Sequence, residues 1–246
     1  MSDVLERSVA GRALSIQIGK FAQQAHGAVA VQYGNTVVLV TACVSSEPRE
    51  GIDFIPLTVD YEERLYAAGK IPGSFIRREG RPTEEAVITS RLIDRSLRPL
   101  LSKEFHNDVQ VVATVLSVDQ ENDPDICALI GASAALTLSD IPFFGPISAI
   151  HVGYIEDALV VNPTLPQMED SLLDLLVASS KENVVMVEAG AREISEEILI
   201  EAIKLGHEVN QEVIELQEEL RRSCGKAKLE IKSREIAPEL SSQIAS

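Results

Sequence analysis

Residues 27–44 read GAVAVQYGNTVVLVTACV, and this stretch predicts a β-hairpin. Apolar residues alternate along its first arm, Gly34-Asn35 supplies a two-residue turn, and its second arm is a nearly continuous run rich in β-branched residues. Residues 53–60 are expected to form a third strand. Because proline cannot donate to a sheet, Pro56 favours an edge position or a bulge for that strand.

The chain beyond this strand predicts further strands and helices arranged in blocks. Helices are expected at 84–97, 124–138 and 196–224, where Thr83, Asp123 and Ser195 are suitable N-caps. Strands are expected at 109–118, 147–155, 158–161, 172–178 and 184–187. Strands and helices in blocks, rather than in strict alternation, favour the α+β class over a doubly wound sheet.

Charge is distributed unevenly along the 246 residues, whose formal net charge is −16. Residues 64–98 contain eight basic and four acidic side chains, a net charge of +4. Residues 156–219 contain sixteen acidic and three basic ones, a net charge of −13. A polyanion should therefore meet the first half of the chain. The absence of Trp and an aromatic content of 4% argue against a broad base-stacking platform.

Cysteines and histidines show no spacing typical of metal ligands, so no metal site is expected within this chain. The odd number of cysteines, in apolar or helical surroundings, predicts buried, reduced thiols. No signal peptide pattern opens the chain and no apolar run is long enough for a bilayer, so we expect a cytoplasmic protein without a membrane partner. The cysteines are Cys43, Cys127 and Cys224, and the histidines are His26, His106, His151 and His207.

Two basic features are candidates for binding RNA. Within the glycine-rich loop 67–82, Phe75 could stack a base while Arg77 and Arg78 hold phosphates, although a solvated basic loop has the same composition. On the following helix, three arginines share one face and could grip a polyphosphate. Their spacing alone favours the structural alternative, because cations suit a helix C-terminus and Asp94 can pair with Arg91 or Arg98. These arginines are Arg91, Arg95 and Arg98.

Several long stretches resemble the first RNase PH-like domain of the bacterial polynucleotide phosphorylase family. They are residues 54–64, 66–75, 77–82, 90–95, 98–100, 124–126 and 131–136. The similarity runs from about residue 15 to about residue 225. It implies an RNase PH-like fold, also called ribosomal protein S5 domain 2-like, over 1–225, with parts at about 12–142 and 145–225. Residues 226–246 would begin an all-helical linker, which we expect to be weakly ordered.

The resemblance also implies an activity for the longer protein of which such a domain is part. That activity is processive phosphorolytic 3′→5′ degradation of single-stranded RNA, in which inorganic phosphate attacks and nucleoside diphosphates leave, with magnesium as cofactor. Family members are ring-shaped homotrimers that thread RNA through a central channel and work with other RNA-degradation proteins.

This domain itself is expected to be catalytically silent. In competent domains of this family, Thr-Arg or serines bind the attacking phosphate where this chain has Pro124 and Asp125, and a carboxylate there repels phosphate. Of the family's Asp, Asp and Lys, only Asp174 is retained, because Met168 and Leu176 occupy the other positions. The chain alone is therefore expected to bind no metal and to have no catalytic residue.

The expected role is to build the ring and to guide RNA. Phe75, Arg77 and Arg78 match a family motif at a constriction of the channel, but Ile76 replaces its second aromatic residue and should weaken stacking there. The resemblance also places Arg98 near the RNA path, with Arg91 and Arg95 as weaker candidates. Two alternatives are a free-standing RNA-binding scaffold or pseudoenzyme of an exosome-like ring, and an unrelated small-molecule enzyme on the same fold.

Overall fold

A computed structural model describes residues 3–73 and 75–231, and its larger sheet has six strands in this part of the chain. Their order is β1-β2-β3-β4-β6-β5, and all neighbours are antiparallel except β5 and β6. The strands are β1 (Val4–Val9), β2 (Arg12–Ile18), β3 (Gly27–Tyr33), β4 (Thr36–Pro48), β5 (Leu57–Glu63) and β6 (Asn107–Ser117). The predicted hairpin is confirmed as β3–β4, and the strand after Pro56 lies at a sheet edge as expected.

The second sheet has four antiparallel strands in the order β10-β9-β7-β8. These strands are β7 (Ser148–Ile155), β8 (Ala158–Val161), β9 (Leu173–Ser179) and β10 (Val184–Ala191). Within the described residues, four α-helices accompany the two sheets: α1 (Glu84–Leu97), α2 (Pro124–Leu138), α3 (Leu165–Glu169) and α4 (Glu196–Cys224). Two short 3-10 helices, η1 (Leu65–Ala68) and η2 (Arg98–Leu100), follow β5 and α1. The α+β prediction is confirmed.

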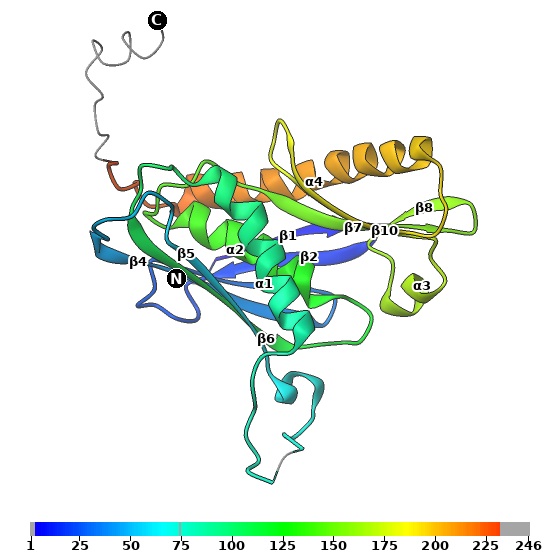
Figure 1. Ribbon diagram of the computed structural model, residues 1–246, viewed down its shortest axis with the longest axis horizontal. Coiled ribbons are helices and arrows are strands. Elements are labelled where there is room, and N and C mark those ends of the chain that lie inside the picture. Colours follow the sequence, from blue (N-terminus) through cyan, green and yellow to red (C-terminus); the bar gives the residue numbers. More distant parts are fainter. Residues whose placement is uncertain (1–2, 74, 232–246) are drawn as a thin grey trace, which may run out of the picture.

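Helix α2 lies at the centre of the molecule, between the larger sheet, β7 and α4 (Figure 1). Every residue from Asp125 to Leu138 is buried, which fits the small side chains of this segment. A Cβ atom at Gly131 would lie 2.5 Å from a methyl group of Val40, so glycine permits the close approach of α2 to β4. Asp123 caps α2 and Pro124 occupies its first turn, as predicted.

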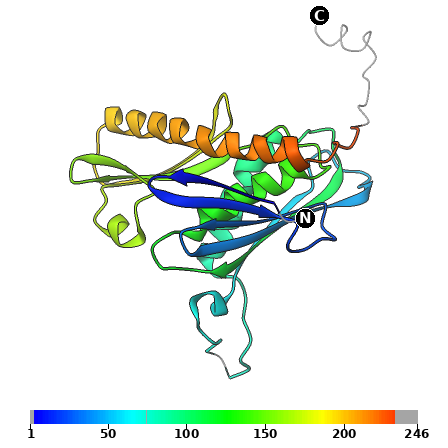
Figure 2. The same cartoon turned by 180° about the vertical axis from the view of Figure 1, so that it is seen from behind.

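The amino-terminal hairpin β1–β2 was not expected from the sequence. It turns at Ala10-Gly11, where both residues have positive φ angles of 49° and 76°. Figure 2 shows this hairpin running beside α4, where Arg7 forms a 2.7 Å ion pair with Glu219. Alanine rarely adopts a positive φ, so the turn had no clear sequence signal.

The expectation of three buried cysteines needs correction. Cys43 is exposed, whereas Cys127 is buried and Cys224 is intermediate. The alternation of β4 turns Ala42 inward, and the next residue faces solvent. Residues 226–231 follow α4 along the end of α2, where the Lys228 ammonium donates to three carbonyls at 2.8 to 3.0 Å. The rest of the predicted linker, 232–246, lies outside the described residues.

Candidate functional site

Residues 64–82 form a protruding loop that extends away from both sheets (Figure 1). Near its tip, Phe75 is fully exposed and the neighbouring side chains of Ile76, Arg77 and Arg78 are exposed as well. Arg77 has a positive φ of 55°, so the backbone bends sharply beside the aromatic residue. Ser74, which belongs to the same predicted motif, lies outside the described residues.

The base of the protruding loop is held by ion pairs and hydrogen bonds. The Arg64 guanidinium lies 2.6 Å from a carboxylate oxygen of Glu79 and also pairs with Glu62. Its hydrogen bond to Glu79, together with a 3.0 Å bond from the backbone N–H of Leu65, lowers the pKa of the Glu79 carboxyl. The Val118 N–H donates to the carbonyl of Ala67 at 3.2 Å. The exposed tip therefore projects from a fixed base.

The three arginines predicted to line one face of α1 lie in different surroundings. Arg98 donates to both oxygens of Asp94 and to the carbonyls of Ile55 and Leu57. The predicted pairing with Asp94 is thus confirmed, and the Arg98 guanidinium holds the end of α1 against the start of β5. Arg95 forms an exposed 2.9 Å ion pair with Glu188, and Arg91 is exposed. Contact of any of the three with RNA stays a prediction.

A cleft of about 1270 Å³ separates the base of the protruding loop and α1 from the second sheet. Its lining contains eight acidic residues and three basic ones. The acidic residues are Glu62, Glu63, Glu79, Glu85, Asp123, Asp125, Asp174 and Glu188, and the basic ones are Arg64, Lys70 and Arg81. Because Arg64 is already paired with two of these carboxylates, the field in the cleft favours cations over phosphate.

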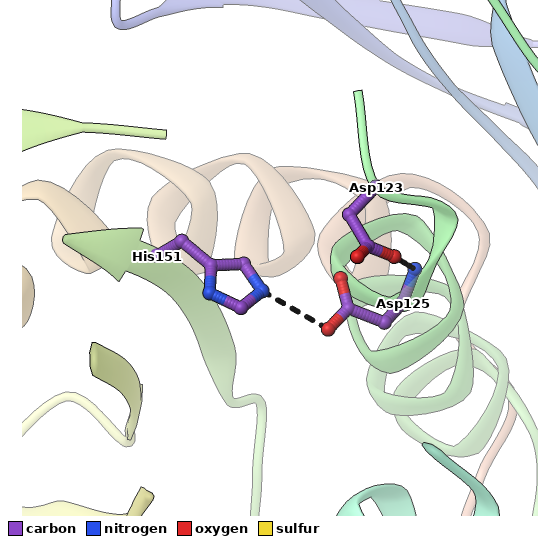
Figure 3. A group of neighbouring side chains, drawn as sticks. All are labelled: Asp123, Asp125 and His151. Carbon is purple, nitrogen blue, oxygen red and sulfur yellow. Dashed lines mark hydrogen bonds and ion pairs between the residues drawn. The ribbon is translucent and has the colours of Figure 1, made fainter. Parts of the chain in front are cut away.

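At one wall of the cleft, Asp123, Asp125 and His151 gather into a cluster (Figure 3). Nε2 of His151 lies 3.0 Å from Oδ2 of Asp125, and the side chains of these two residues are only 18% and 11% exposed. One potential ligand atom from each of the three residues lies within 4.8 Å of the others. On its other side, Nδ1 of His151 lies 3.3 Å from Oδ1 of Asp174, whose side chain is 63% exposed.

Each aspartate of this Asp–Asp–His cluster is oriented by the first turn of α2. A carboxylate oxygen of Asp123 accepts the N–H of Asp125 at 3.0 Å, as an N-cap does. Oδ1 of Asp125 accepts the N–H of Ile126, which leaves Oδ2 to face the imidazole. The histidine comes from β7, whose contact with α2 brings together residues 26 positions apart.

Electrostatics tie the cluster together. Burial and the neighbouring charge of Asp125 raise the pKa of Asp123. Burial alone would raise the pKa of Asp125, but the charge and hydrogen bond of His151 lower it. Burial alone would lower the pKa of His151, but Asp125 and Asp174 raise it well above its usual value. His151 is therefore not isolated, contrary to the expectation from its sequence spacing.

Of the two other positions used to predict a silent domain, Leu176 lines this cleft. Leu176 lies on β9 and is buried, with 3% of its surface exposed, and Met168 lies on the short helix α3. Asp174 faces His151, as described above. Among the residues that the structure describes, the cation paired with the Asp125 carboxylate is thus a histidine, and no lysine joins the cluster.

The fold and the sequence define the class of protein to which this chain belongs. The family model for domain 1 of the 3′ exoribonuclease family matches residues 10–142, and the model for domain 2 of that family matches residues 145–209. The chain belongs to the 3′ exoribonuclease family. Rice (Oryza sativa) Rrp46 has a similar fold, with a TM-score of 0.66 and 15% sequence identity over 89% of this chain and 93% of that chain.

Curated relatives at much higher identity carry one name. The polyribonucleotide nucleotidyltransferase of Heliobacterium modesticaldum is 58% identical over 96% of this chain and 33% of its own length. That of Herpetosiphon aurantiacus is 59% identical over 90% of this chain and 29% of its own length. The chain thus spans about a third of the length of the curated relatives that it matches. No helix within the described residues is both long and apolar enough to span a bilayer.

Proposed function

We propose that this chain is the first, non-catalytic core domain of a phosphorolytic 3′→5′ exoribonuclease of the polyribonucleotide nucleotidyltransferase type. In this proposal the longer protein degrades single-stranded RNA with inorganic phosphate and Mg²⁺ and releases nucleoside diphosphates. The observation that carries the role of this chain is the protruding loop, which presents Phe75, Arg77 and Arg78 to solvent.

The tip of the protruding loop suits a single strand of RNA. An exposed aromatic ring stacks on a base regardless of sequence, and a guanidinium binds a phosphate through two parallel hydrogen bonds. The fixed base formed by Arg64 and Glu79 limits the conformations of the loop that must be ordered on binding. Phe75, Arg77 and Arg78 are the principal RNA contacts of the proposal because they are exposed near the tip of the loop. Arg98, which donates to Asp94 and to two carbonyls, is a secondary contact.

The acidic cleft supports a silent role for the domain. A phosphate ion that entered it would meet Asp125 and Asp123, and the cation nearest to Asp125 is already paired. Ring assembly from three copies, a cytoplasmic location and association with other RNA-degradation proteins complete the proposal. Membership of the 3′ exoribonuclease family and the name of the relatives support the RNA-degrading context of these points.

Replacing Arg77 and Arg78 by Ala in the longer enzyme is expected to weaken binding of long RNA about tenfold. The slope of log affinity against log salt should fall by about 1.4, because two phosphate contacts to a single strand are lost. Fluorescence anisotropy at several salt concentrations measures both quantities. The matched control replaces Arg221 and Arg222, the consecutive arginines at the end of α4, and should leave both unchanged. Unchanged affinity of the loop variant for long RNA would contradict the proposed RNA-guiding role of the loop.

A turnover assay tests the silent role directly. This chain, incubated with oligoadenylate, inorganic phosphate and Mg²⁺, should release no ADP. Sustained ADP release that scales with chain concentration would contradict the proposal, because it would place a complete active site within this domain. The longer enzyme, assayed in parallel, provides the positive control.

A further inference from the structure

The acidic cleft holds a group of side chains that the proposed function does not use. Asp123 and Asp125 come from the start of α2 and His151 comes from β7, so two separate elements supply one imidazole and two carboxylates. We propose that Asp123, Asp125 and His151 bind one divalent first-row transition metal ion, such as Mn²⁺ or Zn²⁺, at the wall of this cleft.

The distances between the candidate ligand atoms fit a single small ion. Ligands bonded at about 2.1 Å lie about 3 to 4 Å apart around one metal ion. Nε2 of His151 and Oδ2 of Asp125 are 3.0 Å apart, and all three ligand atoms lie within 4.8 Å of one another. A small movement of the Asp123 carboxylate would complete the coordination, and water would fill the positions that face the cleft.

The surroundings of the three residues are those of an oriented ligand set. The backbone N–H of Asp125 donates to a carboxylate oxygen of Asp123, and that of Ile126 donates to a carboxylate oxygen of Asp125. These two hydrogen bonds fix the orientation of both carboxylates. Nδ1 of His151 is a buried atom without a hydrogen-bond partner among the described residues, although Oδ1 of Asp174 lies at an ion-pair distance of 3.3 Å. A metal ion on Nε2 would leave the proton on Nδ1, directed at Asp174, which is the carboxylate–histidine–metal arrangement common in proteins.

Charge and ligand type select the class of ion. Two adjacent carboxylates in an acidic cleft are better balanced by a divalent cation than by the single charge of a protonated imidazole. The imidazole nitrogen disfavours Mg²⁺ and Ca²⁺, which prefer oxygen ligands, and favours the transition metals. The ion would join α2 to β7, and thereby link the segments matched by the two family models.

Titration of the metal-free chain with Mn²⁺, followed by electron paramagnetic resonance, tests the proposal. We expect one ion per chain with a dissociation constant in the micromolar range. Pulsed measurements should show ¹⁴N modulation from an imidazole ligand, and this modulation should disappear in His151→Asn. Asp123→Asn, which keeps an N-cap at that position, should weaken binding at least about tenfold.

Matched variants separate the site from general binding to acidic surfaces. Asp170→Asn and His106→Asn change the same residue types outside the cluster, and both should bind Mn²⁺ like the unmodified chain. The ¹⁴N modulation is measured on the unmodified chain, so this part of the test does not depend on whether a variant folds. Circular dichroism checks the fold of each variant. No binding below about 1 mM, no ¹⁴N modulation, or equal affinity in Asp123→Asn would overturn the proposal.

Discussion

The protruding loop and the acidic cleft lie side by side and carry charge in opposite ways. In the loop, Arg77 and Arg78 are exposed near the tip, and an ion pair between Arg64 and Glu79 holds the base. In the cleft, Asp125 and His151 are nearly buried, and each carboxylate of the cluster is oriented by a backbone N–H. The loop offers positive charge where a polyanion can reach it, whereas the cleft places negative charge where a phosphate would have to enter.

The two regions depend on different forces. Side chains at the loop tip are exposed, so their replacement should change RNA binding more than stability. The Asp–Asp–His cluster joins two elements of the core, so its replacement should change stability first. Stability and RNA affinity should therefore separate cleanly between variants of the two regions.

The largest effect is expected for Asp125→Ala, which leaves His151 buried without its nearest carboxylate. Breaking a buried ion pair by removing one partner costs about 3 kcal/mol or more of the free energy of unfolding. Urea unfolding of the chain in the presence of a chelator measures this loss. Asp170→Ala, an exposed aspartate in the connection to β9, should change stability by less than about 0.5 kcal/mol. Equal stability of the two variants would show that the cluster does not hold α2 to β7.

A smaller effect is expected for Asp119→Ala, in the turn that leads into α2. The Asp119 carboxylate accepts the backbone N–H groups of Asn35, Glu121 and Asn122 at 2.9 to 3.0 Å. Their loss should cost about 2 kcal/mol at neutral pH, because several donors lose a charged acceptor. The same urea experiment measures it, and a loss close to that of Asp125→Ala would mean that the turn and the cluster unfold together.

The contribution of Asp119 should depend on pH. Burial alone would raise the pKa of this carboxyl, but the backbone N–H groups of Asn122, Asn35 and Glu121 hold it well below its usual range. A lowered folded-state pKa means that the stabilisation is complete above the ordinary value near 4 and is lost as the pH falls through the folded-state value. The stability difference between the unmodified chain and Asp119→Ala should therefore narrow below about pH 4. A difference that stays constant down to pH 2.5 would contradict this account.

Local sequence predicted much of the fold because its signals act over short distances. Asp123-Pro124 marked the start of α2 and Ser195 the start of α4, since caps and first-turn residues act within three positions. The β1–β2 hairpin was missed because its turn uses an alanine with positive φ. Cys43 was wrongly predicted to be buried, because a run of β-branched residues hides the alternation of inward-facing and outward-facing side chains along β4.

The cleft was less predictable than the loop for a physical reason. The exposure of the loop follows from its glycines and prolines, which break regular structure, and from its charged side chains, which are costly to bury. The contact between Asp125 and His151 depends on how β7 packs against α2, and nothing in the spacing of the two residues indicates it. The pairing of Arg98 with Asp94 could be foreseen from their i, i+4 spacing, whereas its bonds to Ile55 and Leu57 could not.

The smallest effect is expected for Ile76→Phe in the longer enzyme. Ile76 is 72% exposed next to Phe75, so a larger ring there meets no core residue and should change stability by less than about 0.5 kcal/mol. A second aromatic surface should strengthen binding of single-stranded RNA by about 1 kcal/mol, the lower end for one stacked base. Ile71→Phe is the matched control, because Ile71 is 71% exposed in the same loop but lies away from the paired arginines in sequence. A gain confined to Ile76→Phe would locate the RNA path at the loop tip. An equal gain in both variants would instead indicate nonspecific stacking on any exposed ring. That result would contradict the assignment of RNA binding to the loop tip.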